Sequence, residues 1–352
     1  MNCIKDYKPD YTNIIQAATN QTPNRTPLYE HIIAPEIMEK IMNTSFIGLE
    51  KGSFTDKQEY FRQYCDFFKR MGYDTVSYEC CVGEVMPGSG ALGGHKEGVI
   101  KTRADFEKYP WDAIPDLYFE AYMYNFNALK SVMPEGMRAV GGPGNGVFEC
   151  VQDVVGYTNL CYISFDDPEL YRDLFTAVGG MLVKIWELFL DRYSELYAVL
   201  RFGDDLGFKN QTLIAADDIK THIIPQYTKI IQRVHGHDKP FLLHSCGKIF
   251  EVMEDIINIA KINAKHSNED QIAPFSTWLD QYGDRIGNFG GIDMDILCQL
   301  SEVEIKDYVT NVMHYAKDKG GVAIGSGNSI PDYVPVEGYL AMVEAANAFR
   351  IG

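Results

Sequence analysis

The chain has 352 residues, of which 46% are apolar and 23% charged, enough apolar material for a large core. Its 49 acidic residues outnumber its 32 basic residues and give a net charge of −17, so we expect neither nucleic acid nor an acidic membrane surface as a partner. No signal-peptide pattern and no long uncharged apolar window occur, which predicts a cytoplasmic protein whose eight cysteines are reduced.

Strand and helix patterns alternate along the chain. After a polar leader over residues 1–24, Arg25–Glu30 is predicted as a short strand that follows a proline-marked turn. Helical spacing over Asp56–Met71 leads into a β-rich run, Thr75–Glu79, and then into the glycine-rich loop Gly83–Gly98. The same alternation of helical spacing, β-rich runs and loops predicts further strands at 138–141, 198–202, 240–243, 262–265, 286–289 and 322–324, with helices at 170–197, 217–235 and 301–319.

These eight candidate strands predict the fold class α/β, as a single (β/α)8 TIM barrel over residues 1–352. Strands that alternate with helices imply parallel crossovers, and eight such units close a barrel. An open doubly wound sheet is the competing architecture. No linker or change in composition divides the chain.

Polar side chains follow the predicted strands, at the end of the barrel where this fold keeps its catalytic groups. His244 and Cys246 stand at positions i and i+2 of an extended segment, so both point to the same side and can reach one zinc ion. A buried cysteine beside a hydrogen-bonded histidine is the structural alternative. The other strand-end residues are Glu79, Cys80, Asn145, Asp204, Asp205, His266, Glu269, Asp270, Asp293, Ser326 and Asn328.

Two pairs among these residues suit proton chemistry. Asp204 and Asp205 predict either groups that orient a substrate hydroxyl and accept a proton, or a cap of the helix that follows them. His266 and Glu269 predict an acid/base pair, with a solvated loop histidine as the alternative. The loop Gly83–Gly98 is predicted as a mobile lid, and it lacks the lysine of a phosphate-binding P-loop.

Several motifs occur together in the second half of the chain. Phe241–Gly247 reads FLLHSCG, Arg285–Asp293 reads RIGNFGGID, and Gly325–Pro335 reads GSGNSIPDYVP before the helical run Ala341–Ala348. These segments resemble the uroporphyrinogen decarboxylase superfamily, in particular its branch of cobalamin-dependent methyltransferases. The likeness is strongest from about Asp166 to the C-terminus.

The resemblance implies a zinc site. In the methyltransferase branch the His and Cys of an H-x-C motif hold zinc together with a later cysteine, and these positions are His244, Cys246 and Ser326 here. Because a serine hydroxyl is a poor zinc ligand, another group has to complete the site if metal binds. The candidate oxygen ligands are Glu79, which we include in the expected metal set, and Glu84, Asp204, Glu269 and Asp293.

The resemblance further implies a methyltransferase that moves a methyl group between a small donor or acceptor and the cobalt of a corrinoid on a separate partner protein. We expect Asp204, Asp205, His266 and Glu269 to be catalytic, and Asn145, Ser326 and Asn328 to contact the cofactor. The missing cysteine favours O-demethylation of a methoxylated compound, aromatic ones included, over activation of a thiol acceptor.

Two alternatives remain open. Decarboxylation of uroporphyrinogen needs cationic partners for a polycarboxylate substrate, whereas Arg25–Ile33 offers one arginine, with an acid and a histidine at the end of its strand. A barrel without catalysis that binds a tetrapyrrole or a corrinoid protein is the other alternative, and the retained strand-end residues speak against it.

Overall fold

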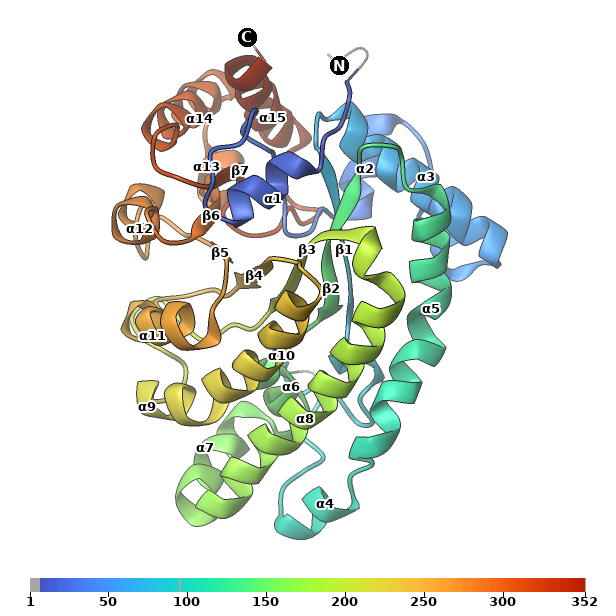
Figure 1. Ribbon diagram of the computed structural model, residues 1–352, viewed down its shortest axis with the longest axis vertical. Helices are drawn as coiled ribbons and strands as arrows, with labels where there is room; N and C mark the ends of the chain where they lie inside the picture. The colour runs from blue at the N-terminus through green and yellow to red at the C-terminus, as the bar shows by residue number, and fades with distance from the viewer. Residues whose placement is uncertain (1–6, 95, 352) are drawn as a thin grey trace.

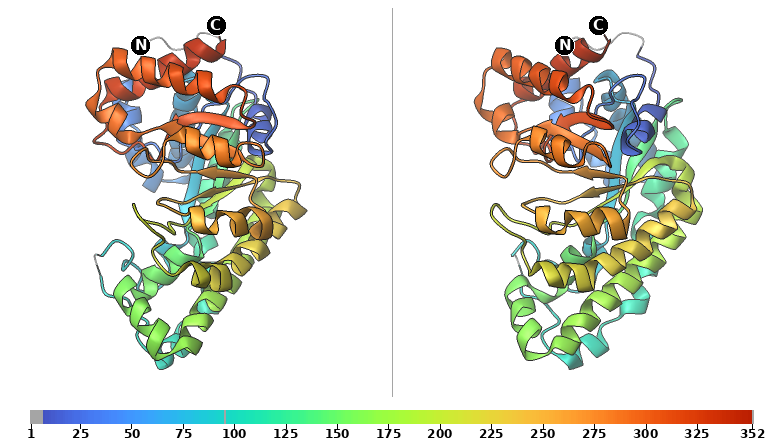
Figure 2. Two further views of the ribbon diagram at one scale, coloured as in Figure 1. Left: turned by 90° about the vertical axis from the view of Figure 1, so that its left-hand side faces the viewer. Right: turned by 60° about the vertical axis from the view of Figure 1, so that its left-hand side comes forward.

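A single parallel sheet organises the chain. The computed structural model describes residues 7–94 and 96–351, and in these its strands pair in the sequential order β1 to β7. The sheet curls around a common axis with helices outside it, as a barrel that is not fully closed (Figures 1 and 2). The strands are β1 (Thr75–Cys81), β2 (Arg138–Gly144), β3 (Tyr197–Gly203), β4 (Phe241–His244), β5 (Ala264–His266), β6 (Gly287–Ile292) and β7 (Val322–Ser326).

The segment predicted as the first strand, Arg25–Glu30, is not a strand in the structure, so the prediction of eight strands is wrong by one. The segment forms an isolated parallel bridge between Leu28 and Ile324 of β7. Pro27 has no N–H group with which to extend this ladder. On the opposite side, the hydroxyl of Ser77 in β1 donates a hydrogen bond to the carbonyl of the segment's last residue. Between this segment and β1, the barrel is therefore joined by a side-chain hydrogen bond in place of the backbone ladder that would close it.

Helices cover the outer face of the sheet (Figure 1). The strands are buried along nearly their whole length because a parallel sheet is covered on both faces. Capping boxes start three of the outer helices, Ser53 with Asp56 at α3, Thr102 with Asp105 at α4 and Ser301 with Glu304 at α14. The α-helices are α1 (Thr12–Ala18), α2 (Pro35–Met42), α3 (Phe54–Arg70), α4 (Arg103–Lys108), α5 (Ile114–Val132), α6 (Val147–Val155), α7 (Tyr157–Asp166), α8 (Pro168–Tyr193), α9 (Ala216–Asp218), α10 (Ile224–Gly236), α11 (Phe250–Asp255), α12 (Phe275–Tyr282), α13 (Met294–Gln299), α14 (Glu302–Ala316) and α15 (Val336–Ile351).

The leader over residues 1–24 contributes to the core. Its helix α1 packs against β3, β6 and β7. Ile14 and Ala17 of this helix join a small apolar cluster inside the sheet with Val140, Val199 and Leu242. Because α1 fills the interior at one end of the sheet, a site can form only at the other end, where β3, β4 and β5 finish.

The predicted lid, Gly83–Gly98, begins with a short turn of 3-10 helix, Gly83–Val85. One carboxylate oxygen of Asp153 in α6 accepts hydrogen bonds from the amides of Gly90 and Leu92, at 2.8 and 3.0 Å. His95 lies outside the described residues, and the mobility of the loop stays a prediction. Among the described residues, no helix is long and apolar enough to cross a membrane.

Candidate functional site

Strand register brings the predicted motif together with its neighbours. β4 ends at His244, which pairs with Gly203 of β3 on one side and with His266 of β5 on the other. Cys246 follows two residues after His244, and Asp204 and Asp205 follow Gly203. The ends of three adjacent strands therefore meet at one small region, as the sequence predicted for a barrel mouth.

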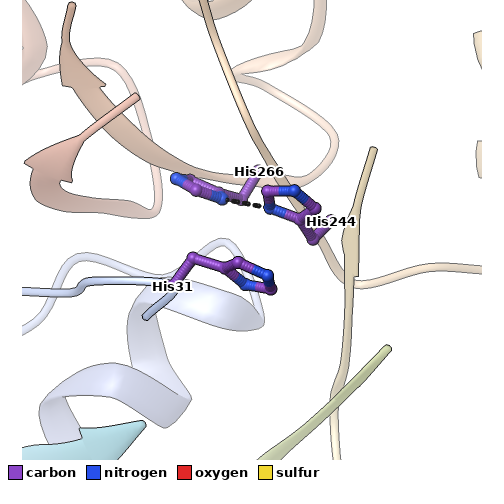
Figure 3. Close-up of side chains that lie close together, drawn as sticks. All are labelled: His31, His244 and His266. Atoms are coloured by element: carbon purple, nitrogen blue, oxygen red, sulfur yellow. Dashed lines mark hydrogen bonds between the residues drawn. The ribbon is translucent and has the colours of Figure 1, made fainter. Parts of the chain in front are cut away.

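His244 and His266 form a hydrogen-bonded relay. Their Nδ1 atoms are 2.7 Å apart (Figure 3). Nε2 of His266 lies 3.0 Å from the carbonyl oxygen of Ser326. Since a carbonyl only accepts, Nε2 of His266 carries the proton and its Nδ1 is the acceptor. Nδ1–H of His244 then donates to His266, which leaves Nε2 of His244 with a free lone pair. This tautomer is the one that a metal-binding imidazole requires.

Burial keeps both rings neutral. It lowers the pKa of His266 to about 3, and the positive charge of Lys265 acts in the same direction. Burial also holds the pKa of His244 well below its usual range, helped by His266 and by Arg201. Both imidazoles therefore remain unprotonated at neutral pH, as ligation demands.

The free nitrogen of His244 faces a thiol and a carboxylate. Nε2 lies 3.5 Å from Sγ of Cys246 and 3.8 Å from Oδ1 of Asp205. The ligand atoms of Asp205, His244 and Cys246 all lie within 4.8 Å of one another. Oδ1 of Asp205 also accepts the amide of Cys246 at 2.8 Å, which fixes the carboxylate beside the motif.

A second group, His31 with His244 and His266, also has its nitrogens within 4.8 Å (Figure 3). Its geometry suits a hydrogen-bonded stack and not a metal. Two nitrogens on one tetrahedral ion are about 3.4 Å apart, longer than the 2.7 Å between His244 and His266. The rings of His31 and His244 are stacked at 3.7 Å and 11°, so their in-plane lone pairs run side by side and do not converge.

Two polar side chains point at the thiol. Nδ2 of Asn328 and the hydroxyl of Ser267 donate toward Sγ of Cys246, at 3.4 and 3.5 Å. Burial raises the pKa of the Cys246 thiol, and the charge of Asp205 raises it further. Without a cation at this place the thiol stays protonated.

Ser326, where the resemblance places a cysteine, is fully buried and already has partners. Its hydroxyl donates to Glu30, and its amide donates to Oε1 of the same side chain at 2.9 Å. Burial raises the pKa of Glu30 to about 8. The Ser326 side chain therefore bonds to Glu30, in the stretch Arg25–Ile33 at the barrel seam. Only the backbone carbonyl of Ser326 takes part in the hydrogen-bonded relay, as the acceptor for His266.

Glu79, predicted as a metal ligand, is paired with the fully buried Arg201. Nε and Nη2 of Arg201 both contact Oε2 of Glu79, at 3.0 and 2.7 Å. Among the described residues its carboxylate is not grouped with His244 and Cys246, whereas that of Asp205 is. The structure thus offers Asp205 as the third ligand of the candidate site.

Asp204 and Glu149 lock the β3 end to α6. The carboxylate of Asp204 accepts the amides of Phe148 and Glu149, at 2.9 and 2.7 Å, so it caps α6, which precedes it in the chain, and not the following helix that the sequence had suggested. Glu149 in turn accepts the amide of Asp205 at 3.1 Å and Nδ2 of Asn145 at 2.8 Å. Burial raises the pKa of Asp204 to about 6. Asp204 of the loop after β3 thus holds the start of α6, and Glu149 of α6 holds the backbone of Asp205 in return.

Both ring nitrogens of His266 are bonded to other groups, His244 and Ser326, so among the described residues it forms no acid/base pair with Glu269. Glu269 lines a cavity of about 360 Å³ with Lys209, Asp293 and Asn328. Since Asn328 also donates to Cys246, this cavity borders the candidate metal site. Burial raises the pKa of Glu269, and the charge of Asp293 adds to the effect. Asp293 itself caps α13 through the amide of Asp295.

Sequence reasoning did not assign His31, Arg201, Glu30 or Glu149 to the site. Arg201 had the clearest signal, because it is a charged residue inside an otherwise apolar strand, AVLRF. Glu30 and His31 lie in the stretch Arg25–Ile33, far from the motif in sequence, and only the three-dimensional fold brings them to it.

Comparison with known proteins identifies the family. The model of the family described as "Uroporphyrinogen decarboxylase (URO-D)" matches residues 11–349. The chain belongs to the uroporphyrinogen decarboxylase family. This confirms the family predicted from the motifs. No curated protein matches the chain.

Solved structures superpose on most of the length of this member of the uroporphyrinogen decarboxylase family. A methyltransferase from Methanosarcina mazei superposes with a TM-score of 0.71 at 13% identity and covers 97% of this chain and 99% of its own. A B12-independent methionine synthase from Shewanella sp. superposes with a TM-score of 0.52 at 13% identity and covers 84% of this chain and 88% of its own. At these identities the likeness establishes the fold.

Proposed function

We propose that this chain is a metal-dependent methyltransferase that moves a methyl group between a small substrate and the cobalt of a corrinoid carried by a partner protein. The observation that carries the proposal is the Asp205–His244–Cys246 group, whose ligand atoms converge at the strand ends. Membership of the family and the shared fold with the Methanosarcina mazei methyltransferase support it.

The three residues fit zinc in ligand type and in spacing. Around a tetrahedral zinc ion, nitrogen and sulfur ligands lie about 3.6 Å apart and nitrogen and oxygen ligands about 3.4 Å apart. The separations from Nε2 of His244 are 3.5 Å to Sγ of Cys246 and 3.8 Å to Oδ1 of Asp205. Three protein ligands leave the fourth position open, which is typical of catalytic zinc.

Zinc bound there would act as a Lewis acid toward a substrate oxygen or thiol. The chain's own residues prepare the site for it. His266 orients His244 and sets its tautomer, and the hydrogen bonds from Asn328 and Ser267 stabilise Cys246 as a thiolate. The amide of Cys246 holds Oδ1 of Asp205 beside the motif.

We favour transfer from a methoxylated substrate to cobalt. An open position beside one thiolate, one imidazole and one carboxylate suits an ether oxygen, because the carboxylate replaces the second thiolate that a thiol-activating site would use to raise sulfur nucleophilicity. A polycarboxylate substrate for decarboxylation would instead meet Asp205, Glu149 and Glu269 at this mouth, and the buried Arg201 is already neutralised by Glu79.

The experiment is an anaerobic incubation of the zinc-loaded protein with a reduced corrinoid protein and one methyl donor at a time. Methoxyarenes, methylamines and methyl thiols are the donors, and the Co(I) to methyl-Co(III) spectral change is the readout. We expect the change with a methoxyarene, and we expect its loss in a Cys246→Ser variant. The absence of any change with all three classes would overturn the proposal.

A further inference from the structure

His31 and Glu79 present two polar atoms without hydrogen-bond partners among the described residues. Nε2 of His31 and Oε1 of Glu79 are 3.9 Å apart, too far for a hydrogen bond. Their side chains are only 7% and 8% exposed. The second ring nitrogen of His31, Nδ1, is fully buried without a partner among the described residues, whereas Nε2 of His31 and Oε1 of Glu79 are not among the fully buried unpartnered atoms. Two unpaired polar atoms on nearly buried side chains that stay accessible can receive a ligand.

The surroundings hold both atoms in place. Arg201 contacts only Oε2 of Glu79, with two of its nitrogens, and this leaves Oε1 unused. A third nitrogen of Arg201 donates to the backbone carbonyl of His31 at 3.0 Å. The His31 ring is fixed from the other side by its stack on His244 (Figure 3). The pair is therefore rigid before any ligand arrives, which reduces the entropy lost on binding.

The donor and acceptor properties of the pair define the ligand. The charge on Glu79 favours the His31 tautomer with its proton on Nε2, so the pair consists of one donor and one charged acceptor. An oxygen about 2.8 Å from each atom can bridge them. A hydroxyl accepts from His31 and donates to Glu79, whereas a carboxylate would be repelled by Glu79 and an ammonium group would face the N–H of His31.

We propose that His31 and Glu79 form a subsite for a substrate hydroxyl group next to the metal site. This inference rests on the proposed function, which supplies the methoxyl group of the substrate. The hydroxyl subsite narrows the substrate class to methoxylated alcohols or phenols. The stack of His31 on the ligand His244 places the hydroxyl close to the reacting ether, so both groups belong to one small molecule.

The test compares matched ligands that differ by one hydroxyl. Isothermal titration calorimetry measures the binding of methoxybenzene and of 2-, 3- and 4-methoxyphenol to the native chain without a corrinoid protein. We expect at least one methoxyphenol to bind about tenfold more tightly than methoxybenzene, since two hydrogen bonds, one of them charged, form in a buried site. Equal binding of all four compounds by the native protein, or binding of none, would overturn the subsite without any variant.

Two variants assign the preference to His31. His31→Phe keeps a ring to stack on His244 and removes both nitrogens, so the preference should fall to within about twofold. His31→Gln keeps an N–H donor and should retain part of it. The exposed His314→Phe is the matched control and should behave as the native chain. A His31→Phe variant that keeps the full preference would contradict the assignment.

Zinc binding and methyl transfer, measured on the same preparations, separate this inference from the proposed function. A hydroxyl preference in a protein that binds no zinc supports the subsite and counts against the metal-dependent transferase. Zinc binding and transfer without a hydroxyl preference support the transferase and overturn the subsite.

Discussion

The β4 end and the β7 end of the sheet both place a small polar side chain beside an acid, but they use it differently. At the β4 end, Oδ1 of Asp205 accepts a backbone amide, and the thiol of Cys246 and the Nε2 lone pair of His244 remain available. At the β7 end, the hydroxyl of Ser326 is bonded to the buried Glu30. The first arrangement leaves three atoms that can bind a cation, whereas the second is saturated by the protein itself.

For the proposed enzyme, this difference means that a metal site can form without the cysteine that the resemblance implies. The position that the motifs align with a cysteine has become part of the seam between β7 and the stretch Arg25–Ile33. The oxygen offered in its place comes from Asp205 on the β3 side, which Glu149 and the Cys246 amide hold in position. In the proposed enzyme the ligand set has therefore moved around the barrel mouth from the β7 loop to the β3 loop.

The largest expected effect comes from removing the thiol at the β4 end. Cys246→Ser should lower zinc affinity at least about 100-fold, since changes outside the ligand shell alone cost 10- to 100-fold. Elemental analysis of the purified protein and a competitive chelator titration measure this. The exposed Cys161→Ser is the control and should keep about one zinc per chain. Equal zinc content in the two variants would refute ligation by Cys246.

A direct comparison of the two ends is the next test. Asp205→Asn should weaken zinc binding by about 10- to 100-fold, because a neutral amide oxygen replaces a charged ligand. Ser326→Ala should leave the affinity within about threefold, since the hydroxyl faces Glu30 and the relay uses the Ser326 carbonyl. The same chelator titration applies to both. The reverse order of effects would assign the third ligand to the β7 end.

The relay between the two ends predicts a smaller effect. His266→Phe preserves a buried ring but removes the acceptor for Nδ1–H of His244, so zinc affinity should fall about tenfold. A cobalt-substituted protein should show a shifted visible spectrum in the variant, because the orientation of the imidazole changes while Cys246 remains a ligand. An unchanged affinity and spectrum would show that His266 does not set the tautomer of His244.

Much of the fold could be predicted from the sequence, and the failures have physical causes. β-Rich runs that end at glycines and polar loops located β1 to β7, because buried parallel strands are short, apolar and sharply bounded. Arg25–Glu30 has the same local pattern and still forms only a bridge. Whether such a segment becomes a strand depends on pairing at the barrel seam, which no local pattern records.

In the candidate site, too, residues with a local sequence pattern could be predicted, and residues placed by tertiary contacts could not. His244 and Cys246 could be found because their i, i+2 spacing is local, and Asp205 was predicted among the strand-end acids. Glu79 was expected as a ligand and Asp205 was not, because the difference between them depends on the pairing of Glu79 with Arg201, a residue 122 positions away in the sequence. His31 was noted only as a polar end to its segment, and its stack on His244 arises from tertiary packing alone.

A separate expected effect lies at the β7 end and concerns stability. Burial raises the pKa of Glu30 to about 8 from an ordinary 4.5, so the folded chain holds this proton between those pH values and the unfolded chain does not. The stabilisation is complete below the unfolded pKa and is lost as the pH rises through about 8. Urea unfolding should thus give a native chain that loses on the order of 1 kcal/mol per pH unit relative to Glu30→Gln between pH 6 and 7.5.

Glu120→Gln, a change at an exposed position on α5, is the control and should titrate in parallel with the native protein. If the native chain and Glu30→Gln also titrate in parallel, Glu30 is ionised in the folded state. The β7 end would then hold a buried negative charge beside Ser326, and the contrast with the β4 end would disappear because both ends would offer an anionic oxygen to a cation. A steeper loss in the native chain instead means a neutral, proton-sharing Glu30–Ser326 pair, which has no reason to attract zinc.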